Sequence, residues 1–290
     1  MPSEIPAVQT PARREPPRDQ LLKWIGNKQA YAGAITELLP AEFDRYIEPF
    51  VGTGAVLAAL EPRTALAGDA LKPLIDFWKL VQDSPDELGD HYEDCWFKLD
   101  ASPVAAYATI RDRFNDAPSP HDLLVISRAC YAGVVRFTRA GKLSTPLGPH
   151  RPISPESMRA RLETWSTRVQ GVEFVHQDFV DTMATASDGD VIYCDPPYAY
   201  SQAMLYGAQD FKLDTLWEEI ARAKSRGATV ALSIDGHRRQ GKLPIELNIP
   251  QDLFARELLF ERGGCRLRRF QLAGQTTAGE EVSDRLLLTW

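Results

Sequence analysis

The residues with the clearest chemical potential are Asp195, Pro196, Pro197 and Tyr198, which follow a short apolar run, Val191–Cys194. The run is rich in β-branched and aromatic residues and predicts a buried strand. The two prolines lack a backbone N–H and end that strand. A carboxylate, two rigid carbonyls and an aromatic ring would then stand at the carboxyl end of a strand, where open α/β sheets bind ligands.

This combination of groups suits an amino group on a flat ring, such as N6 of adenine. That nitrogen is a poor nucleophile because its lone pair is delocalised into the ring. A carboxylate and a carbonyl that accept its two N–H bonds would push the lone pair back toward nitrogen. Tyr198 can stack on the base, and the base must leave a duplex to reach such a pocket. The alternative is that these residues form only a strand-ending turn.

Length and composition indicate a globular protein. The chain has 290 residues, of which 44% are hydrophobic and 25% charged, enough for one large or two smaller domains. It has no apolar run of about 20 residues and no signal-peptide segment, so we expect a cytoplasmic protein with no membrane partner. The four cysteines lie far apart and the five histidines are scattered, which predicts reduced thiols and no metal site. These cysteines are Cys95, Cys130, Cys194 and Cys265.

The net charge of -7 argues weakly against a nucleic-acid partner, but the charge is unevenly distributed. Residues 81–122 carry ten acids and three bases, a net of -7. Residues 123–172 carry eight bases and two acids, a net of +6. One face could therefore be locally basic, and a solvated surface of mixed charge is the alternative.

The N-terminal part contains two glycine turns. Residues 1–20 are proline-rich with few large apolar residues and predict a flexible tail. Lys23 and Lys28 flank the first turn, a candidate anion cradle. Gly52 and Gly54 lie between a predicted strand and a predicted helix, where backbone can approach a ligand.

A second predicted strand ends at Asp69, where a ribose-binding carboxylate belongs. The pattern then changes over residues 82–165, which predict several helices and a hairpin or loop near Gly141. Strand and helix signals alternate again after residue 171. Residues 199–212 have no clear period and predict a loop over the site, and the C-terminus predicts an antiparallel pair.

Six stretches of the chain, taken together and in this order, resemble the N6-adenine DNA methyltransferase family of the Dam type. They cover a lysine-rich opening, a cofactor loop, two recognition segments, an adenine-side motif and the D-P-P-Y motif. The stretches are Lys23–Lys28, Tyr46–Gly54, Arg128–Arg136, Gly141–Gly148, Gln177–Phe179 and Asp195–Tyr198.

The resemblance implies an α/β fold, a Rossmann-like mixed seven-stranded methyltransferase sheet with an inserted, mainly helical target-recognition domain. Residues 21–81 and 166–290 would form the catalytic domain, and residues 82–165 the insert. S-adenosylmethionine would be the methyl donor and double-stranded DNA the partner of a monomer or weak dimer.

The resemblance also implies roles for single residues. Trp24 and Lys28 would hold the methionine end of the cofactor, Asp69 the ribose hydroxyls, and Asp178 and Phe179 the adenine ring. The implied cofactor contacts are Trp24, Lys28, Phe50, Gly52, Gly54, Asp69, Asp178 and Phe179. The implied catalytic residues are Asp195, Pro196, Pro197 and Tyr198, and the implied DNA contacts are Lys23, Tyr131, Arg136 and Lys142.

Two departures from the family pattern concern recognition. Ala132 stands where the family usually has Asn, and Leu143-Ser144-Thr145-Pro146 stands where it has F-N-x-P. The resemblance implies GATC as the target, because Arg128–Gly148 is spaced as in family members that read it, and these changes favour relaxed or altered reading.

Other functions remain as alternatives. The same chemistry would serve an RNA adenine or a DNA N4-cytosine methyltransferase, although the cytosine class more often begins its motif with Ser. A decayed DNA-binding module is disfavoured by the intact Asp195–Tyr198 motif. A nicotinamide dehydrogenase is disfavoured because Leu57 breaks the glycine fingerprint.

Overall fold

The computed structural model describes residues 13, 15–24, 26–138, 140–197, 211–238, 249–250, 252–262 and 282–290. Seven strands form one sheet in the order β3-β2-β1-β4-β5-β7-β6. They are β1 (Tyr46–Glu48), β2 (Ala65–Asp69), β3 (Val172–His176), β4 (Val191–Cys194), β5 (Thr229–Arg238), β6 (Arg256–Arg262) and β7 (Val282–Leu288). Strand β7 is antiparallel to β5 and β6, and the other neighbours are parallel. The predicted mixed seven-stranded α/β sheet is therefore confirmed.

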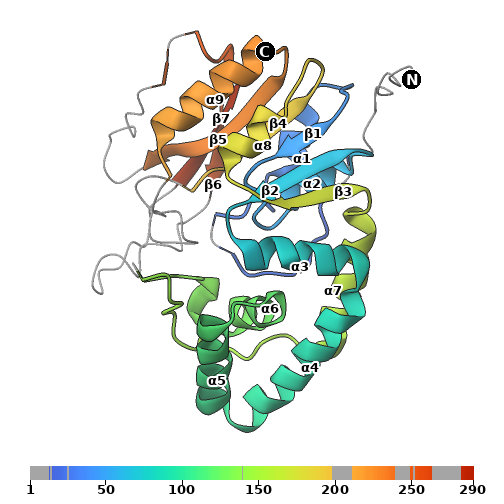
Figure 1. Cartoon of the computed structure of the whole chain (residues 1–290), viewed down its shortest axis with the longest axis vertical. Coiled ribbons are helices and arrows are strands. Elements are labelled where there is room, and N and C mark those ends of the chain that lie inside the picture. Colours follow the sequence, from blue (N-terminus) through green and yellow to red (C-terminus); the bar gives the residue numbers. More distant parts are fainter. Residues whose placement is uncertain are drawn as a thin grey trace.

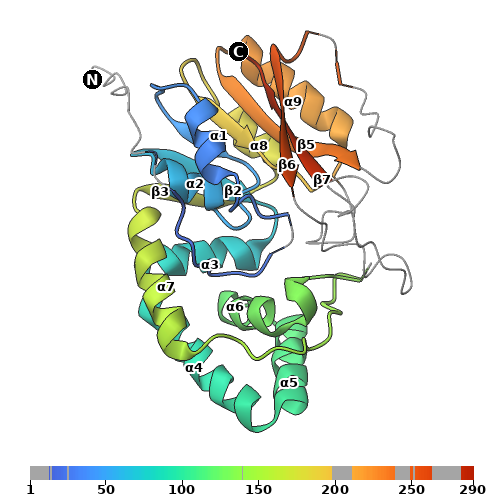
Figure 2. The same ribbon diagram turned by 180° about the vertical axis from the view of Figure 1, so that it is seen from behind.

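The sheet has a hydrophobic core on each face. Successive strand residues point to opposite faces and so enter different cores. Tyr46 lies in one core and Ile47 in the other. Helices cover both faces (Figures 1 and 2). Those over the Tyr46 face are α1 (Ala32–Leu38), α2 (Ala55–Leu60) and α3 (Lys72–Asp83), and those over the Ile47 face are α8 (Phe179–Ala184) and α9 (Leu213–Ser225). Burial on both faces explains why strands such as β4 are apolar at every position.

A second group of helices lies below the sheet in Figure 1 and is called the helical lobe (residues 85–168). Each of its four helices begins with a Ser-Pro pair, with serine at the N-cap and proline at the first helical position, where its missing N–H costs nothing. The helices are α4 (Pro85–Ala101), α5 (Pro103–Asp116), α6 (Pro120–Ala129) and α7 (Pro155–Arg168).

The helical lobe shares its core with the sheet. Trp78 of α3 packs against Trp165 of α7, with ring centroids 5.5 Å apart. The boundaries predicted near residues 82 and 165 fall inside α3 and α7 rather than between elements. Figure 2 shows α7 running alongside α4 toward the sheet.

The predicted hairpin near Gly141 is present. After α6 the chain makes one turn of 3-10 helix, η1 (Tyr131–Gly133), and then doubles back so that Phe137 pairs with Leu143. The side chain of Asn115 at the end of α5 holds this hairpin by donating to the Leu143 carbonyl at 3.0 Å and accepting from its N–H at 2.6 Å.

The prediction of a flexible tail over residues 1–20 is wrong for the part that the structure describes. Residues 15–24, the crossing segment, pack along the sheet and the helical lobe, and Pro17 is buried. The Asp19 carbonyl accepts a hydrogen bond from the Trp165 indole at 2.9 Å. The error came from composition, because prolines that look like a linker are here fixed by contacts with distant residues.

Several predicted or possible elements fall outside the described residues. They are residues 199–210 of the loop over the site and residues 263–281 of the expected C-terminal pair. Within the described residues β7 is antiparallel to both β5 and β6, and neither β6 nor the short helix α8 was predicted.

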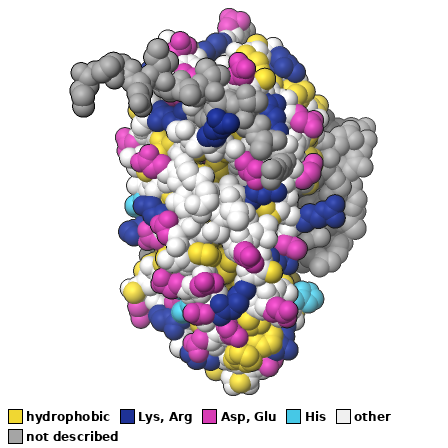
Figure 3. Space-filling model, turned by 90° about the vertical axis from the view of Figure 1, so that its right-hand side faces the viewer, with side chains coloured by type: hydrophobic (Ala, Val, Ile, Leu, Met, Phe, Trp, Pro, Cys, Tyr) yellow, Lys and Arg dark blue, Asp and Glu magenta, His cyan; other side chains and the backbone are white. Residues whose placement is uncertain are grey.

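The surface carries both charge signs. Acidic and basic side chains are interspersed over the side shown in Figure 3, and hydrophobic side chains gather at its lower end, where α4 and α5 meet in Figure 1. Phe97 and Val104 are exposed large hydrophobic residues of these two helices. Among the described residues, no helix has both the length and the apolar character that a membrane crossing requires.

Candidate active site

The carboxyl ends of the parallel strands bring the motif residues to one edge of the sheet. The first residues of three parallel strands pair with one another, Tyr46 of β1 with Ala65 of β2 and Val191 of β4, so the strands run side by side toward the same edge. Asp69 is the last residue of β2 and Asp195 directly follows β4. This is the edge at which open α/β sheets bind their ligands.

Asp195 is held by a buried lysine. The ammonium of Lys28 lies 2.6 Å from Asp195 Oδ1 and also donates to the Gly26 carbonyl at 3.0 Å. Lys28 is 3% exposed and Asp195 is 19% exposed, so one face of the carboxylate still reaches the surface. Pro196 is buried and Pro197 is half-buried. Tyr198 lies outside the described residues.

A second acid, Glu48, lies buried at the end of β1 and was not singled out as a site residue from the sequence. Tyr46 donates its hydroxyl to Glu48 Oε2 at 2.8 Å. Burial raises the pKa of Glu48 to about 8, and the negative charge of Asp195 adds to this increase. The carboxyl of Glu48 therefore favours its neutral form beside the charged Asp195. An acid within an otherwise apolar strand was the available sequence signal.

The glycine turn after β1 requires glycine at both positions. Gly52 has φ +47° and Gly54 has φ +63°, in the left-handed region. A Cβ at Gly54 would also lie 3.2 Å from the Trp78 ring, whose N–H donates to the Gly52 carbonyl at 2.9 Å. Trp24 lies on the other side, since a Cβ at Gly52 would be 4.0 Å from its indole nitrogen. The turn is thus packed between two tryptophans.

Asp69 fastens this turn to the end of β2. Its carboxylate accepts the Gly52 N–H at 3.3 Å and the Leu71 N–H at 2.9 Å. Burial nevertheless raises the pKa of Asp69 to about 6, because it outweighs these two hydrogen bonds. Each carboxylate oxygen retains a lone pair that can accept a further bond from a ligand.

Three aromatic rings lie together beside the turn. Phe50 stacks on Phe179 at a centroid distance of 5.2 Å, and Phe211 meets both rings at 6.0 and 5.6 Å. Phe179 begins α8, whose N-cap Asp178 is exposed and accepts the Val180 N–H at 2.9 Å. Phe211 was not among the predicted contacts, although the sequence placed it in the loop over the site.

The predicted DNA contacts lie in two places: Lys23 and Tyr131 at η1, and Arg136 and Lys142 in the hairpin that follows it. Lys23 packs on η1, since a Cβ at Gly133 would be 2.5 Å from Lys23 Cβ. Burial, and then the charge of Arg128, lower the pKa of Lys23. Tyr131 opens η1 and is half-buried, with its N–H bonded to the Pro146 carbonyl at 2.9 Å.

Arg136 and Lys142 belong to the hairpin and are exposed. The Ser144 N–H donates to the Arg136 carbonyl at 2.9 Å, so the two arms of the hairpin are joined at Arg136. The ammonium of Lys142 donates to the Asn115 carbonyl. Lys23 therefore packs on η1, which Tyr131 opens, and Arg136 and Lys142 lie in one hairpin.

The backbone conformation at Ala132 suits the Asn of the family pattern better than it suits alanine. Its φ is +54° and its ψ is +13°, so it occupies the left-handed region that asparagine tolerates well and alanine does not. The Asn usual in the family at this position would relieve the backbone as well as offer an amide. The turn keeps its shape here with a residue that is poorly suited to it.

Chemically, the edge offers hydrogen-bond acceptors suited to a polar planar group, a glycine turn that lets backbone approach a ligand, and aromatic surface. A family model described as D12 class N6 adenine-specific DNA methyltransferase matches residues 24–243. The match includes Lys28, Gly52, Gly54, Asp69 and Asp195.

Curated relatives agree with this family model. The DNA adenine methylase of Vibrio cholerae serotype O1 is 31% identical over 225 residues, which cover 73% of this chain and 79% of the relative. The DNA N-6-adenine-methyltransferase of Escherichia phage P1 is 31% identical over 234 residues, which cover 78% of this chain and 29% of the relative. The DNA adenine methylase of Escherichia coli is 30% identical over 183 residues, which cover 61% of this chain and 64% of the relative. The chain therefore belongs to the D12 class N6 adenine-specific DNA methyltransferases.

Proposed function

We propose that this protein transfers a methyl group from S-adenosylmethionine to N6 of an adenine that has been flipped out of a short duplex target. The observation that supports this most directly is the position of Asp195. Its carboxylate stands at the carboxyl end of a central strand, partly exposed, with a buried ammonium 2.6 Å away.

The catalytic step would rest on hydrogen-bond acceptors. Asp195 would accept one N–H of the adenine amino group and the Pro196 carbonyl the other, so that the nitrogen lone pair becomes available for attack. S-adenosylmethionine supplies an electrophilic methyl group. After the transfer N6 must lose a proton, and Asp195 would accept it. Tyr198, which follows directly, would stack on the base.

Lys28 would act on Asp195. It was expected to hold the methionine carboxylate of the cofactor, but its ammonium contacts Asp195 Oδ1 and the Gly26 carbonyl. We therefore assign it to fixing the catalytic carboxylate and stabilising its charge. The methionine end would then lie against Trp24 and the glycine turn.

The remaining cofactor contacts follow from the geometry of the edge. Gly52 and Gly54 leave the backbone open to close approach, and Asp69 would accept the ribose hydroxyls with its free lone pairs. Phe50 and Phe179 would pack on the adenine ring of the cofactor, with Asp178 at its rim. Phe211 completes this aromatic surface.

The helical lobe would carry target recognition. Arg136 is exposed on a hairpin that Asn115 holds in place, so its guanidinium can reach a guanine edge and make two hydrogen bonds. Lys142 and Lys23 would contact phosphates, and Tyr131 would wedge between bases. The proposed target is GATC, with relaxed or altered reading where Ala132 and Ser144 replace the usual asparagines.

The proposed function is tested by transfer of tritium from labelled S-adenosylmethionine to unmodified duplex DNA, followed by identification of the modified nucleoside. We expect N6-methyladenine. N4-methylcytosine, a preference for RNA, or DNA binding without any transfer would each contradict the proposal in favour of one named alternative.

The target is tested separately by methylation-sensitive sequencing of treated genomic DNA. Arg136→Ala should flatten the preference among bases, whereas Lys142→Ala should weaken all sequences alike and lower the salt dependence. Methylation at another motif would replace GATC and leave the reaction intact. An unchanged motif in the Arg136→Ala variant would remove the hairpin from recognition.

A further inference from the structure

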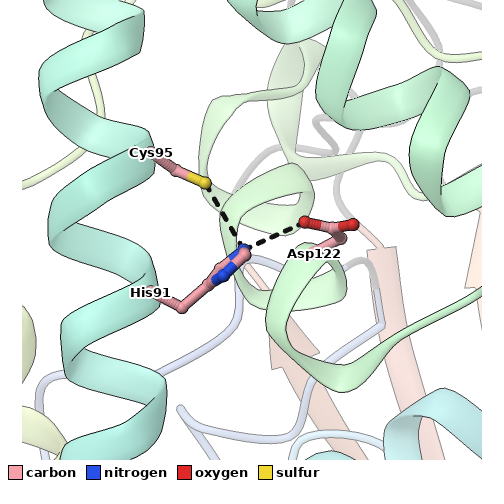
Figure 4. Close-up of side chains that lie close together, drawn as sticks. All are labelled: His91, Cys95 and Asp122. Atoms are coloured by element: carbon pink, nitrogen blue, oxygen red, sulfur yellow. Dashed lines mark hydrogen bonds and ion pairs between the residues drawn. The ribbon is translucent and has the colours of Figure 1, made fainter.

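Three metal-ligating side chains converge in the helical lobe, far along the chain from the sheet edge. His91 and Cys95 lie one turn apart on α4, and Asp122 faces them from the first turn of α6 (Figure 4). His91 Nε2 is 3.0 Å from Asp122 Oδ1 and 3.4 Å from Cys95 Sγ. All three ligand atoms lie within 4.8 Å of one another.

These distances match a tetrahedral zinc site. With Zn–N and Zn–O bonds of about 2.0–2.1 Å and a Zn–S bond of about 2.3 Å, two ligand atoms of a tetrahedron are about 3.3–3.6 Å apart. The separations of 3.0 and 3.4 Å from His91 Nε2 are near this range, and the Cys95 and Asp122 ligand atoms, no more than 4.8 Å apart, would have to lie within it once the metal is bound. Imidazole nitrogen, thiolate sulfur and carboxylate oxygen are together a ligand set that zinc accepts.

Each of the three groups has a partner in the cluster, but His91 Nε2 cannot bond both of its neighbours through one hydrogen. His91 Nε2 carries at most one hydrogen, yet a carboxylate oxygen and a sulfur both approach it. Cys95 and Asp122 are buried, so neither can turn to water instead. A cation at the point of convergence would be bound by all three groups at once.

The cluster is open to entry from solvent. It borders a hollow of about 490 Å³ lined by Glu87, His91, Arg113, Ala117, Ser119, His121 and Asp122. The ring of His121 lies 5.2 Å from that of His91, and His121 Nε2 is bonded to Glu87 Oε1 at 2.8 Å. The fourth position of a metal could therefore be filled by water from the hollow or by His121 after it leaves Glu87.

A positive group already stands at this point. Arg113 binds Asp122 through Nε at 2.8 Å and through Nη2, and the same Nη2 lies 3.4 Å from His91 Nε2 and 3.8 Å from Cys95 Sγ. The Arg113 side chain is 46% exposed and can withdraw into water.

We propose that His91, Cys95 and Asp122 form a zinc-binding site in which the metal replaces the Arg113 guanidinium and ties α4 to α6. The site is independent of the methyl-transfer reaction. Arg113 acts as an internal competitor, so that binding is weaker than at a dedicated structural zinc site.

The test uses the full chain, freed of metal with EDTA and titrated with Co²⁺ and then Zn²⁺. We expect one equivalent of Co²⁺ to give the visible absorption of a tetrahedral ion together with a sulfur-to-cobalt charge-transfer band, and Zn²⁺ to remove both. Cys95→Ser should abolish the charge-transfer band, and Cys130→Ser, which changes another buried thiol of the same lobe, should retain it. No band in the wild type, or a band that survives Cys95→Ser, would overturn the proposal.

Competition by Arg113 gives a second test, which does not depend on loss of binding. Arg113→Gln should bind Zn²⁺ about tenfold or more tightly than the wild type, because the internal cation is gone. Asp122→Asn should bind at least about tenfold more weakly. Unchanged affinity in Arg113→Gln would show that the metal does not enter the place that Arg113 occupies, and the site as drawn would be wrong. Circular dichroism of each variant checks that it is folded.

Discussion

Two acids of similar burial behave in opposite ways in the two parts of the molecule. Glu48 at the sheet edge is 3% exposed, and Asp122 in the helical lobe is 1% exposed. Burial raises the pKa of Glu48 to about 8. Burial also acts to raise the pKa of Asp122, but hydrogen bonds from Arg113 and His91 outweigh it and lower the value to about 2.

The difference lies in the partners, because the acids are similarly buried. Asp122 receives two bonds from a guanidinium and one from an imidazole, whereas Glu48 receives a neutral hydroxyl and lies near a second carboxylate. Under-neutralised acids at a ligand-binding edge cost stability and are typical of functional sites. In the helical lobe, oppositely charged side chains are paired, and their bonds join α4, α5 and α6. Variants at the acids of each region should therefore differ in sign as well as in size.

The largest effect is expected at Asp195. Asp195→Asn keeps the shape but replaces one accepting oxygen with a donor, so methyl transfer should fall by about 10²–10⁴-fold. Calorimetric titration with S-adenosylmethionine should show nearly unchanged binding. Asp181→Asn on the exposed side of α8 is the matched control. Turnover close to normal in Asp195→Asn would remove the carboxylate from the mechanism.

Glu48→Gln tests the cost of an under-neutralised acid. The pKa of Glu48 is raised in the fold, so the folded protein binds one more proton than the unfolded chain between about pH 4.5 and 8. Stability from this group is present at low pH and is lost as pH rises toward 8. Urea unfolding should show the wild type losing on the order of 4 kcal/mol relative to Glu48→Gln across this range. Parallel pH profiles for the two proteins would mean that Glu48 is ionised in the fold.

Asp122→Asn should have the opposite sign. Arg113 and His91 would lose their charged partner, and removal of one member of a buried pair costs 3–5 kcal/mol when the other cannot reach water. Because Arg113 is half-exposed, we expect a loss of about 2–3 kcal/mol, measured by urea unfolding in EDTA. Asp116→Asn, an exposed acid at the end of α5, is the control. Equal stability of Asp122→Asn and Asp116→Asn would mean that the charge of Asp122 contributes no more to stability than the charge of an exposed acid.

Asp69→Asn sharpens the comparison within the sheet edge. The Gly52 and Leu71 N–H groups bond to different oxygens of Asp69, so the asparagine oxygen can accept only one of them, and the charge proposed to bind ribose hydroxyls is lost. A lost charge-assisted hydrogen bond of about 1.5–2 kcal/mol corresponds to roughly 10–30-fold weaker cofactor binding. Calorimetry measures this, and unchanged affinity would leave Asp69 with only its role in fastening the turn.

The smallest effect concerns backbone strain in the lobe. Ala132→Asn should stabilise the protein by about 0.5–1 kcal/mol, since asparagine is more at ease at a φ of +54°. Ala132→Gly should also stabilise, because glycine carries no Cβ. Chemical unfolding compares the three proteins. If both variants are destabilised, the strain at this turn is balanced by contacts of the Ala132 methyl group.

Much of the fold could be predicted because its signals are contiguous. The strand and proline pair at Asp195 and the glycine turn at Gly52 each lie within a few residues, and the Ser-Pro pairs mark the starts of the lobe helices. The contacts that define the site's electrostatics are not local. Lys28 and Asp195 are 167 positions apart, and His91 meets Asp122 across 31. Spacing rules for metal ligands therefore missed a cluster that only tertiary packing assembles.

The crossing segment has a consequence for biosynthesis. Its Asp19 carbonyl bonds to Trp165 and its Gln20 carbonyl to Arg161, which follow 146 and 141 positions later. At translation rates of about 5–20 residues per second, these partners emerge from the ribosome roughly 7–30 s after the segment itself. During that interval the carbonyl groups of Asp19 and Gln20 lack these native hydrogen-bond donors, and chaperones or other nascent chains can bind the segment. The segment can therefore dock only once α7 has been made, whereas β3 to β7 follow α7 in the chain, so docking can precede completion of the sheet.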